Sequence, residues 1–188
     1  MPHPVAVVAE TERQYCPYEA REVSALLRKM SRAPLIARPG KGFIYAQTVE
    51  SKADIVARAL EALTGSKPRI VRPPEPESPV EAMSISVVLV DVGHYWLAHE
   101  VLEHAWGEGA DWLHAPTVAT AALVKAQEGD LSAARWIMEN LAARVRDPHR
   151  LVDWKCLETA VASVAACNMP YWAGECIASR IYEGPPPI

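Results

Sequence analysis

The segment RPPEPES, residues 72–78, has three prolines in seven residues. Because proline lacks a backbone N–H and has a fixed φ angle, such a segment forms neither a helix interior nor a central strand. The chain has 188 residues and half of them are apolar, which is enough for two small hydrophobic cores. The sequence therefore predicts two domains, residues 1–71 and 79–184, joined by a proline-rich linker at 72–78 and followed by a frayed tail at 185–188.

The formal net charge of −4 is unevenly distributed along the chain. Residues 1–75 hold twelve Lys and Arg against eight Asp and Glu, whereas the remaining residues hold seven against fifteen. This mild basic excess does not require a nucleic-acid partner. No apolar run is long enough to span a bilayer and the N-terminus lacks a signal-peptide pattern, so we expect a cytoplasmic protein with no membrane partner. The few Gln and Asn residues and the many prolines favour a thermophilic source.

Residues 1–71 alternate between strand and helix patterns. A turn is expected at Pro39-Gly40-Lys41-Gly42, because Pro and Gly are typical turn residues. The periodicity of the apolar residues predicts strands at 4–10, 33–38, 42–49 and 68–72 and helices at 18–30 and 51–65. The resulting order, βαββαβ, predicts a ferredoxin-like domain, in which two helices cover one face of four antiparallel strands. The fold class expected for the whole chain is α+β.

The residues after the linker are expected to form a bundle of five or six helices. Ser78 supplies an N-cap hydroxyl, Pro79 the first helical position and Glu81 the carboxylate of a capping box, so a helix should begin at Pro79 and end at Gly93. Further helices are expected at 94–106, 116–126, 130–146, from 147 to just before Pro170, and at 171–182. The short connections, rich in Gly and Pro, favour an all-α domain of antiparallel neighbours.

The stretch GHYWLAHEVLEHAW, residues 93–106, is dense in histidine, glutamate and aromatic residues. His99 and Glu103 are four residues apart, so on a helix they stand on one face, about 6 Å apart at their Cβ atoms. In one interpretation they bind one divalent metal ion as a cofactor, and Glu100 is the base that activates a water molecule. In the other interpretation, His99 and Glu103 form a hydrogen-bonded pair at the edge of the core.

Two further residues of this stretch are expected to surround the site. Trp106 lies at the edge of the apolar stripe, beside His99 and Glu103, and His104 stands four residues after Glu100. In the metal interpretation, Trp106 and His104 support the ligands without binding the ion themselves. No second motif in the chain indicates a third metal ligand.

The same residues resemble the signature helix of domain-of-unknown-function family three hundred and nine, whose pattern is G-x-Y-[FW]-x-A-H-E-x-L-E-x-x-W. The matching positions are His99, Glu100, Glu103 and Trp106. The resemblance covers residues 79–146 and implies an all-α domain, and because some members are labelled predicted metal-dependent hydrolases it also implies that activity. The third expected helix lacks the Gln-Gly pair of many members, so the resemblance assigns no site residue there.

Lys41, Phe43 and Tyr45 lie in or next to the third expected strand, in a stretch partly similar to the one that carries stacking aromatics in RNA-recognition motifs. Phe43 and Tyr45 share one face of the strand and could stack bases, while Lys41 meets a phosphate. The first expected strand has no aromatic residue, which favours ordinary strand packing of the two rings. The sequence thus leaves two functions open: a metal-dependent hydrolase, or a non-enzymatic adaptor that binds RNA or a protein partner through the N-terminal sheet.

The four cysteines, Cys16, Cys156, Cys167 and Cys176, do not have the spacing of zinc ligands. If Cys156 and Cys167 share one helix, they lie roughly 16 Å apart, which is too far for a disulfide. Cys176 can reach either of them if the C-terminal segment folds back. Both pairings therefore stay open.

Overall fold

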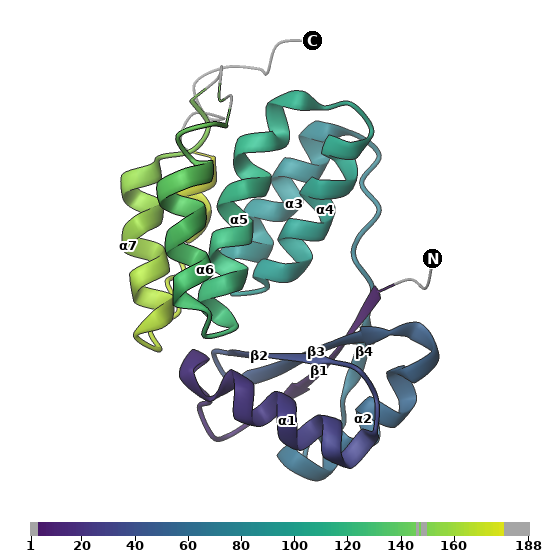
Figure 1. Ribbon diagram of the computed structural model, residues 1–188. Coiled ribbons are helices and arrows are strands. Elements are labelled where there is room, and N and C mark those ends of the chain that lie inside the picture. The colour runs from purple at the N-terminus through teal and green to yellow at the C-terminus, as the bar shows by residue number, and fades with distance from the viewer. Residues whose placement is uncertain (1–3, 146, 148–149, 179–188) are drawn as a thin grey trace. The chain divides into compact units, whose positions relative to one another are not determined.

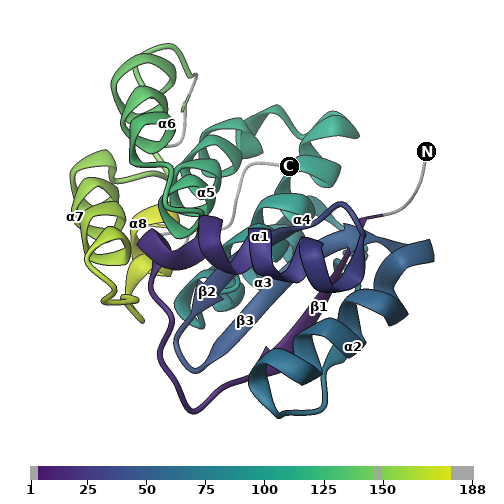
Figure 2. The same ribbon diagram turned by 60° about the horizontal axis from the view of Figure 1, so that its bottom comes forward.

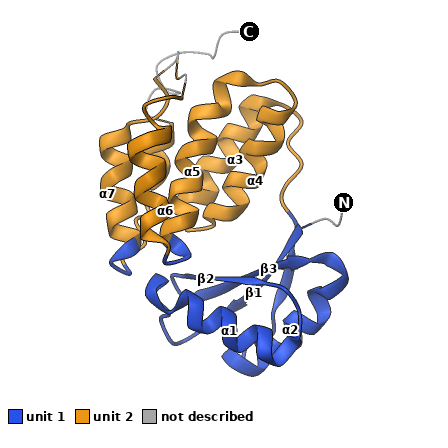
Figure 3. Ribbon diagram, viewed as in Figure 1, with its two compact units in different colours: residues 1–72, 127–129, 165–167 blue, residues 73–126, 130–164, 168–188 orange. Residues whose placement is uncertain are grey.

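The structure is a computed structural model that describes residues 4–145, 147 and 150–178 of the chain. The described residues contain eight α-helices and one four-stranded antiparallel sheet, so the chain is α+β. They form two compact units, which Figure 3 distinguishes by colour. Unit 1 comprises residues 1–72, 127–129 and 165–167, and unit 2 comprises residues 73–126, 130–164 and 168–188. The expected frayed tail at 185–188 lies outside the described residues.

Unit 1 contains the sheet and two helices. The strands are β1 (Pro4–Glu10), β2 (Ile36–Gly40), β3 (Phe43–Val49) and β4 (Arg69–Val71). Their order is β2-β3-β1-β4, and every neighbouring pair is antiparallel. Helices α1 (Ala20–Ser31) and α2 (Ala53–Thr64) lie on the same face of the sheet (Figure 1 and Figure 2).

Alternating apolar residues of β1 supply the core of unit 1. Val5, Val7 and Ala9 are almost completely buried, in one cluster with Leu27 of α1 and Leu60 of α2. Successive side chains of a strand point to opposite faces, so the spacing of two residues places all three under the helices. Ala6, on the opposite face, is also fully buried, so the apolar residues of β1 do not by themselves decide which face packs against the helices.

The turn between β2 and β3 is shorter than the sequence predicts. Pro39 and Gly40 belong to β2, and only Lys41 and Gly42 form the turn. Gly42 has a φ angle of +76°, a left-handed conformation that glycine adopts without a steric penalty. β2 accommodates Pro39 because it is an edge strand, where the missing N–H interrupts no ladder on its outer side.

The helices described for the second half of the chain are α3 (Pro79–Asp91), α4 (Tyr95–Gly107), α5 (His114–Gln127), α6 (Leu131–Trp136), α7 (Trp154–Ala165) and α8 (Ala173–Ile177). None of the helices in the described part of the chain is long and apolar enough to cross a bilayer. The Ser78 hydroxyl accepts a hydrogen bond from the Glu81 N–H at 3.2 Å, so α3 begins where the sequence predicts. The Glu81 carboxylate accepts the N–H of Glu77 instead of that of Ser78.

Three of the expected helices differ from their predicted bounds by more than two residues. A π-helical turn, Ile137–Leu141, follows α6 within the fourth expected helix. α7 begins later than expected, because the Asp147 carboxylate accepts the N–H groups of Leu151 and Val152 and holds them in a loop. The last expected helix, 171–182, is represented by the short α8, and its residues 179–182 lie outside the described part.

Each disulfide pairs two cysteines of the same unit. Cys156 is bonded to Cys176 in unit 2, with their Cα atoms 5.4 Å apart. Of the two partners that the sequence left open for Cys176, the structure therefore has Cys156. Cys16 is bonded to Cys167 in unit 1, with their Cα atoms 5.0 Å apart. The sequence did not indicate this second bond, because 151 residues separate its two cysteines and local spacing carries no information over that distance.

Gly174 of α8 packs closely against α3. A Cβ atom at this position would lie 2.7 Å from Oδ1 of Asp91 and 2.8 Å from the carbonyl oxygen of Val87. We expect Gly174→Ala to lower the free energy of unfolding by about 1–3 kcal/mol, the usual cost of overpacking. Gly107→Ala is the matched control, because nothing lies within 4 Å of the Cβ position there. Urea denaturation compares the two variants, and equal effects would show that space at Gly174 is not limiting.

Candidate functional site

The motif predicted from the sequence lies on α4, within unit 2. The buried side of this helix is apolar and consists of Tyr95, Trp96, Leu97, Ala98, Val101, Leu102 and Ala105, all at most 4% exposed. His99, Glu103 and Trp106 follow one another at intervals of four and three residues, so they line a different side of the helix. The distance of 3.8 Å between Nε2 of His99 and Oε2 of Glu103 agrees with this spacing.

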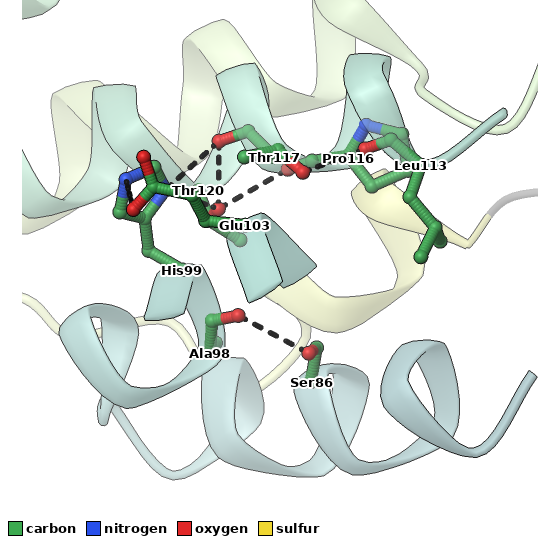
Figure 4. A network of polar contacts seen from close by, with 8 residues as sticks. All are labelled: Ser86, Ala98, His99, Glu103, Leu113, Pro116, Thr117 and Thr120. Carbon is green, nitrogen blue, oxygen red and sulfur yellow. Dashed lines mark hydrogen bonds and ion pairs between the residues drawn. The ribbon is translucent and has the colours of Figure 1, made fainter. Parts of the chain in front are cut away.

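His99 connects α4 to α5. Its Nδ1 lies 3.1 Å from the carbonyl oxygen of Thr117 and 3.3 Å from Oγ1 of Thr120 (Figure 4). A carbonyl oxygen can only accept a hydrogen bond, so Nδ1 must carry the proton that it donates. In the neutral imidazole this leaves the lone pair on Nε2. The contact with Thr117 thus fixes both the orientation of the ring and its tautomer.

Nε2 of His99 faces the carboxylate of Glu103. The distance from Nε2 to Oε2 is 3.8 Å, and the two side chains are 21% and 57% exposed. This distance is longer than a hydrogen bond, yet short enough for one small group, such as a water molecule, to contact both atoms. His99 and Glu103 therefore lie side by side where solvent can reach both of them.

Hydroxyl groups on the neighbouring helices keep this pair in place. The Thr120 hydroxyl donates to the Thr117 carbonyl at 2.9 Å, which leaves the hydroxyl oxygen free to accept from His99. The Thr117 hydroxyl donates to the Leu113 carbonyl at 2.7 Å. On the other side of α4, the Ser86 hydroxyl of α3 lies 3.2 Å from the Ala98 carbonyl oxygen (Figure 4). Thr117, Thr120 and Ser86 are at most 5% exposed.

Trp106 stacks on His114, the first residue of α5. The ring centroids are 4.4 Å apart and the planes differ by 8°. We refer to His99, Glu103 and Trp106 of α4 together with His114, Thr117 and Thr120 of α5 as the α4–α5 site. The sequence indicated His114 as a further candidate without a direction for its side chain, and it did not identify Thr117 and Thr120. Two threonines three residues apart in an alanine-rich helix could have indicated a polar face.

His104 lies apart from this arrangement. Nε2 of His104 is 3.4 Å from a carboxylate oxygen of Glu108, and both side chains are more than 60% exposed. Glu100 follows His99 directly, so its side chain leaves the helix about 100° further round than that of His99. The structure thus brings Trp106 to the site and pairs His104 with a carboxylate outside it.

Tyr95 belongs to the core and not to the α4–α5 site. Its side chain is fully buried, and its hydroxyl contacts Sδ of Met169 at 3.9 Å. Burial raises the pKa of this hydroxyl, and the negative charge of Asp91 raises it further. The hydroxyl therefore stays protonated at physiological pH and does not act as a base.

The residues of the α4–α5 site do not fit a catalytic metal centre. Catalytic zinc sites use three protein ligands, and the described residues contain no group of three or more His, Cys, Asp or Glu side chains arranged to hold a metal ion. His99 and Glu103 supply two donors, and His114 is stacked on Trp106.

Lys41, Phe43 and Tyr45, the candidate contacts for RNA or a protein partner, have different exposures. Lys41 is exposed in the β2–β3 turn, Phe43 is half-buried, and Tyr45 is only 2% exposed. The rings of Phe43 and Tyr45 meet edge to face with centroids 5.9 Å apart. Burial raises the pKa of Tyr45, and the positive charge of nearby Arg38 offsets this only in part. A base could not stack on Tyr45 without moving the groups that cover it.

Comparison with known proteins connects the α4–α5 site to one family. Residues 86–137 match the family model described as Domain of unknown function (DUF309), the family that the α4 motif resembles. The matched segment includes every residue of the α4–α5 site and Ser86. No match was found among curated proteins or among solved structures.

Proposed function

We propose that the segment matching DUF309 is a hydrolytic site in which His99 acts as the general base. The observation that supports this most strongly is the hydrogen bond from Nδ1 of His99 to the Thr117 carbonyl, which leaves the Nε2 lone pair facing Glu103 at 3.8 Å. A histidine whose tautomer is fixed in this way is a common proton acceptor in enzymes. The partial exposure of both side chains allows water and a substrate to approach.

In the proposed reaction, a water molecule lies between Nε2 of His99 and the carbonyl carbon or phosphorus of an ester. The water oxygen attacks that atom while Nε2 takes the proton, and the same proton then passes to the departing alcohol oxygen. The Glu103 carboxylate stabilises the imidazolium that forms in between, because opposite charges attract across this short distance.

A second candidate function is favoured by the same contacts. The hydrogen bond of His99 joins α4 to α5, and that of Ser86 joins α3 to α4. The Thr120 hydroxyl forms its hydrogen bond within α5. Such bonds stabilise a buried polar cluster, and they would also explain the motif in a non-enzymatic scaffold. The two functions differ in whether Nε2 of His99 is needed.

The experiment separates these functions with His99→Asn. The amide N–H of Asn can still donate to the Thr117 carbonyl, but Asn has no counterpart of the Nε2 lone pair. We expect the wild type to hydrolyse p-nitrophenyl acetate or bis-p-nitrophenyl phosphate, and His99→Asn to lower kcat/KM by about 10²–10⁴-fold at a nearly unchanged Tm. Glu103→Gln should lower it less, and Glu108→Gln, a change in an exposed pair on the same helix, should not affect it.

Several outcomes would contradict the proposal. Hydrolysis that survives His99→Asn would exclude His99 as the base, and hydrolysis that disappears after chelation would favour the metal-dependent interpretation. If the wild type hydrolyses neither substrate and His99→Ala lowers Tm while His99→Asn does not, the scaffold function is supported.

We also propose that unit 1 is a ferredoxin-like domain and that residues 72–78 are a linker. The element order β1-α1-β2-β3-α2-β4 and the strand order β2-β3-β1-β4 support a ferredoxin-like arrangement. The division of the chain after Arg72 supports a linker at 72–78 between the two domains. An adaptor role for unit 1, with RNA or a protein as the partner, depends on Lys41 and Phe43, because Tyr45 is buried.

A further inference from the structure

A pocket of about 520 Å³ lies in unit 1, where β1 and β2 begin and β3 ends. Its walls are mostly apolar and include Pro34, Ile36 and Val49. The polar side chains in the lining are those of Arg28, Gln47 and Thr48. Binding sites for small molecules usually have about 300–1,000 Å³ and apolar walls with a few polar groups. This pocket has such a volume and composition, but it is a shallow hollow that is open to solvent.

The adjacent edge of the sheet is closed to a further strand. The Leu35 carbonyl accepts a hydrogen bond from Nε of Arg28 at 2.8 Å, and the Ala37 N–H donates to Oγ of Ser24 at 2.9 Å. Both side chains come from α1. They form hydrogen bonds with backbone groups on the outer side of β2, which an added strand would need for pairing. This arrangement favours a small molecule over an extended peptide as the occupant.

Arg28 supplies the one charge among the residues that line the pocket. Its Nε is held by the Leu35 carbonyl, so the guanidinium plane has a defined direction. In the part of the chain that the structure describes, no carboxylate forms an ion pair with Arg28. The two terminal nitrogens have the geometry that binds a carboxylate through two parallel hydrogen bonds. The Thr48 hydroxyl is already bonded to the Pro34 carbonyl and does not compete for the ligand.

We propose that this pocket binds a small monocarboxylate with an apolar body. The carboxylate lies on the terminal nitrogens of Arg28, and the apolar body lies against Ile36 and Val49. A cationic ligand is disfavoured, because it would be repelled by Arg28. This binding site is independent of the α4–α5 site, since all its lining residues belong to unit 1.

The test uses 3-phenylpropanoate and its amide, which have the same shape and differ in charge. Both are titrated into the full ¹⁵N-labelled chain, and binding is followed through the backbone amide signals. We expect the acid to shift the signals of Leu35, Gln47 and Val49 and to bind at least about tenfold more tightly than the amide, the usual effect of a charge-assisted hydrogen bond. In Arg28→Gln the two compounds should bind equally.

Ile36→Glu provides a second variant in case Arg28→Gln alters α1. Ile36 is 39% exposed, so a glutamate fits there. Both compounds lose the apolar contact with Ile36, but the negative charge should weaken binding of the acid at least about tenfold more than binding of the amide. The Tm of each variant shows whether it is folded. Equal binding of acid and amide by the wild type, shifts at other residues, or no binding at millimolar concentration would overturn the proposal.

Discussion

Replacing Glu128 with alanine is expected to lower the free energy of unfolding by about 3–5 kcal/mol, because it leaves the charge of Arg38 buried without its carboxylate. Arg38 lies on β2, and its side chain is 3% exposed, while that of Glu128 is 11% exposed. Nε and Nη2 of Arg38 donate to the same oxygen of Glu128, at 2.9 and 2.5 Å. Both residues belong to unit 1, and urea denaturation followed by circular dichroism measures the loss.

The control is an ion pair of the same chemistry at the surface. Arg72 and Glu50 are 65% and 48% exposed, and Glu50→Ala should cost at most about 1 kcal/mol because solvent screens such pairs. Removing both buried charges, in Arg38→Met with Glu128→Leu, should restore much of the stability lost in Glu128→Ala. A cost for Glu128→Ala no larger than that for Glu50→Ala would show that the buried pair is not important for stability.

Removing the Cys16–Cys167 disulfide should lower the free energy of unfolding more than any other substitution proposed for this protein. Its cysteines are 151 residues apart, and the entropy of closing a loop of that length in the unfolded chain corresponds to about 5 kcal/mol. Changing both cysteines to serine therefore should lower the free energy of unfolding by about that amount. The measurement is urea denaturation of the oxidised wild type and of the double variant.

The Cys156–Cys176 disulfide is the internal comparison. It closes a loop of only 20 residues, for which the same relation gives about 3 kcal/mol. The serine variant of this pair should therefore be more stable than that of the first pair. A thiol titration of the unfolded, unreduced wild type should detect no free thiol from these four cysteines. Free thiols, or the opposite order of stability, would contradict the assigned pairing or the loop-entropy argument.

The helices and most strands could be predicted from the sequence, because their signals are local. The apolar run from Val5 to Ala9 indicates the strand β1, and Ser78 fixes the beginning of α3. The spacing of His99 and Glu103 places them on one side of α4. Each of these features depends on residues within a few positions of one another, where the strand and helix periods apply.

Element ends were less predictable where a side chain competes with the backbone. Asp147 looked like the start of a helix, yet its carboxylate binds the N–H groups of Leu151 and Val152, so that α7 begins only at Trp154. The same type of residue caps helices and forms loops, and its local sequence does not distinguish the two.

The sequence by itself determined the α+β composition and the placement of His99 and Glu103 one helical turn apart. Only the tertiary structure decided what these residues contact. The Thr117 carbonyl, which fixes the tautomer of His99, comes from another helix. Glu128 meets Arg38 across 90 residues, and Cys167 meets Cys16 across 151. Contacts between such distant positions depend on how whole elements pack, and the period of a single helix or strand carries no information about that packing.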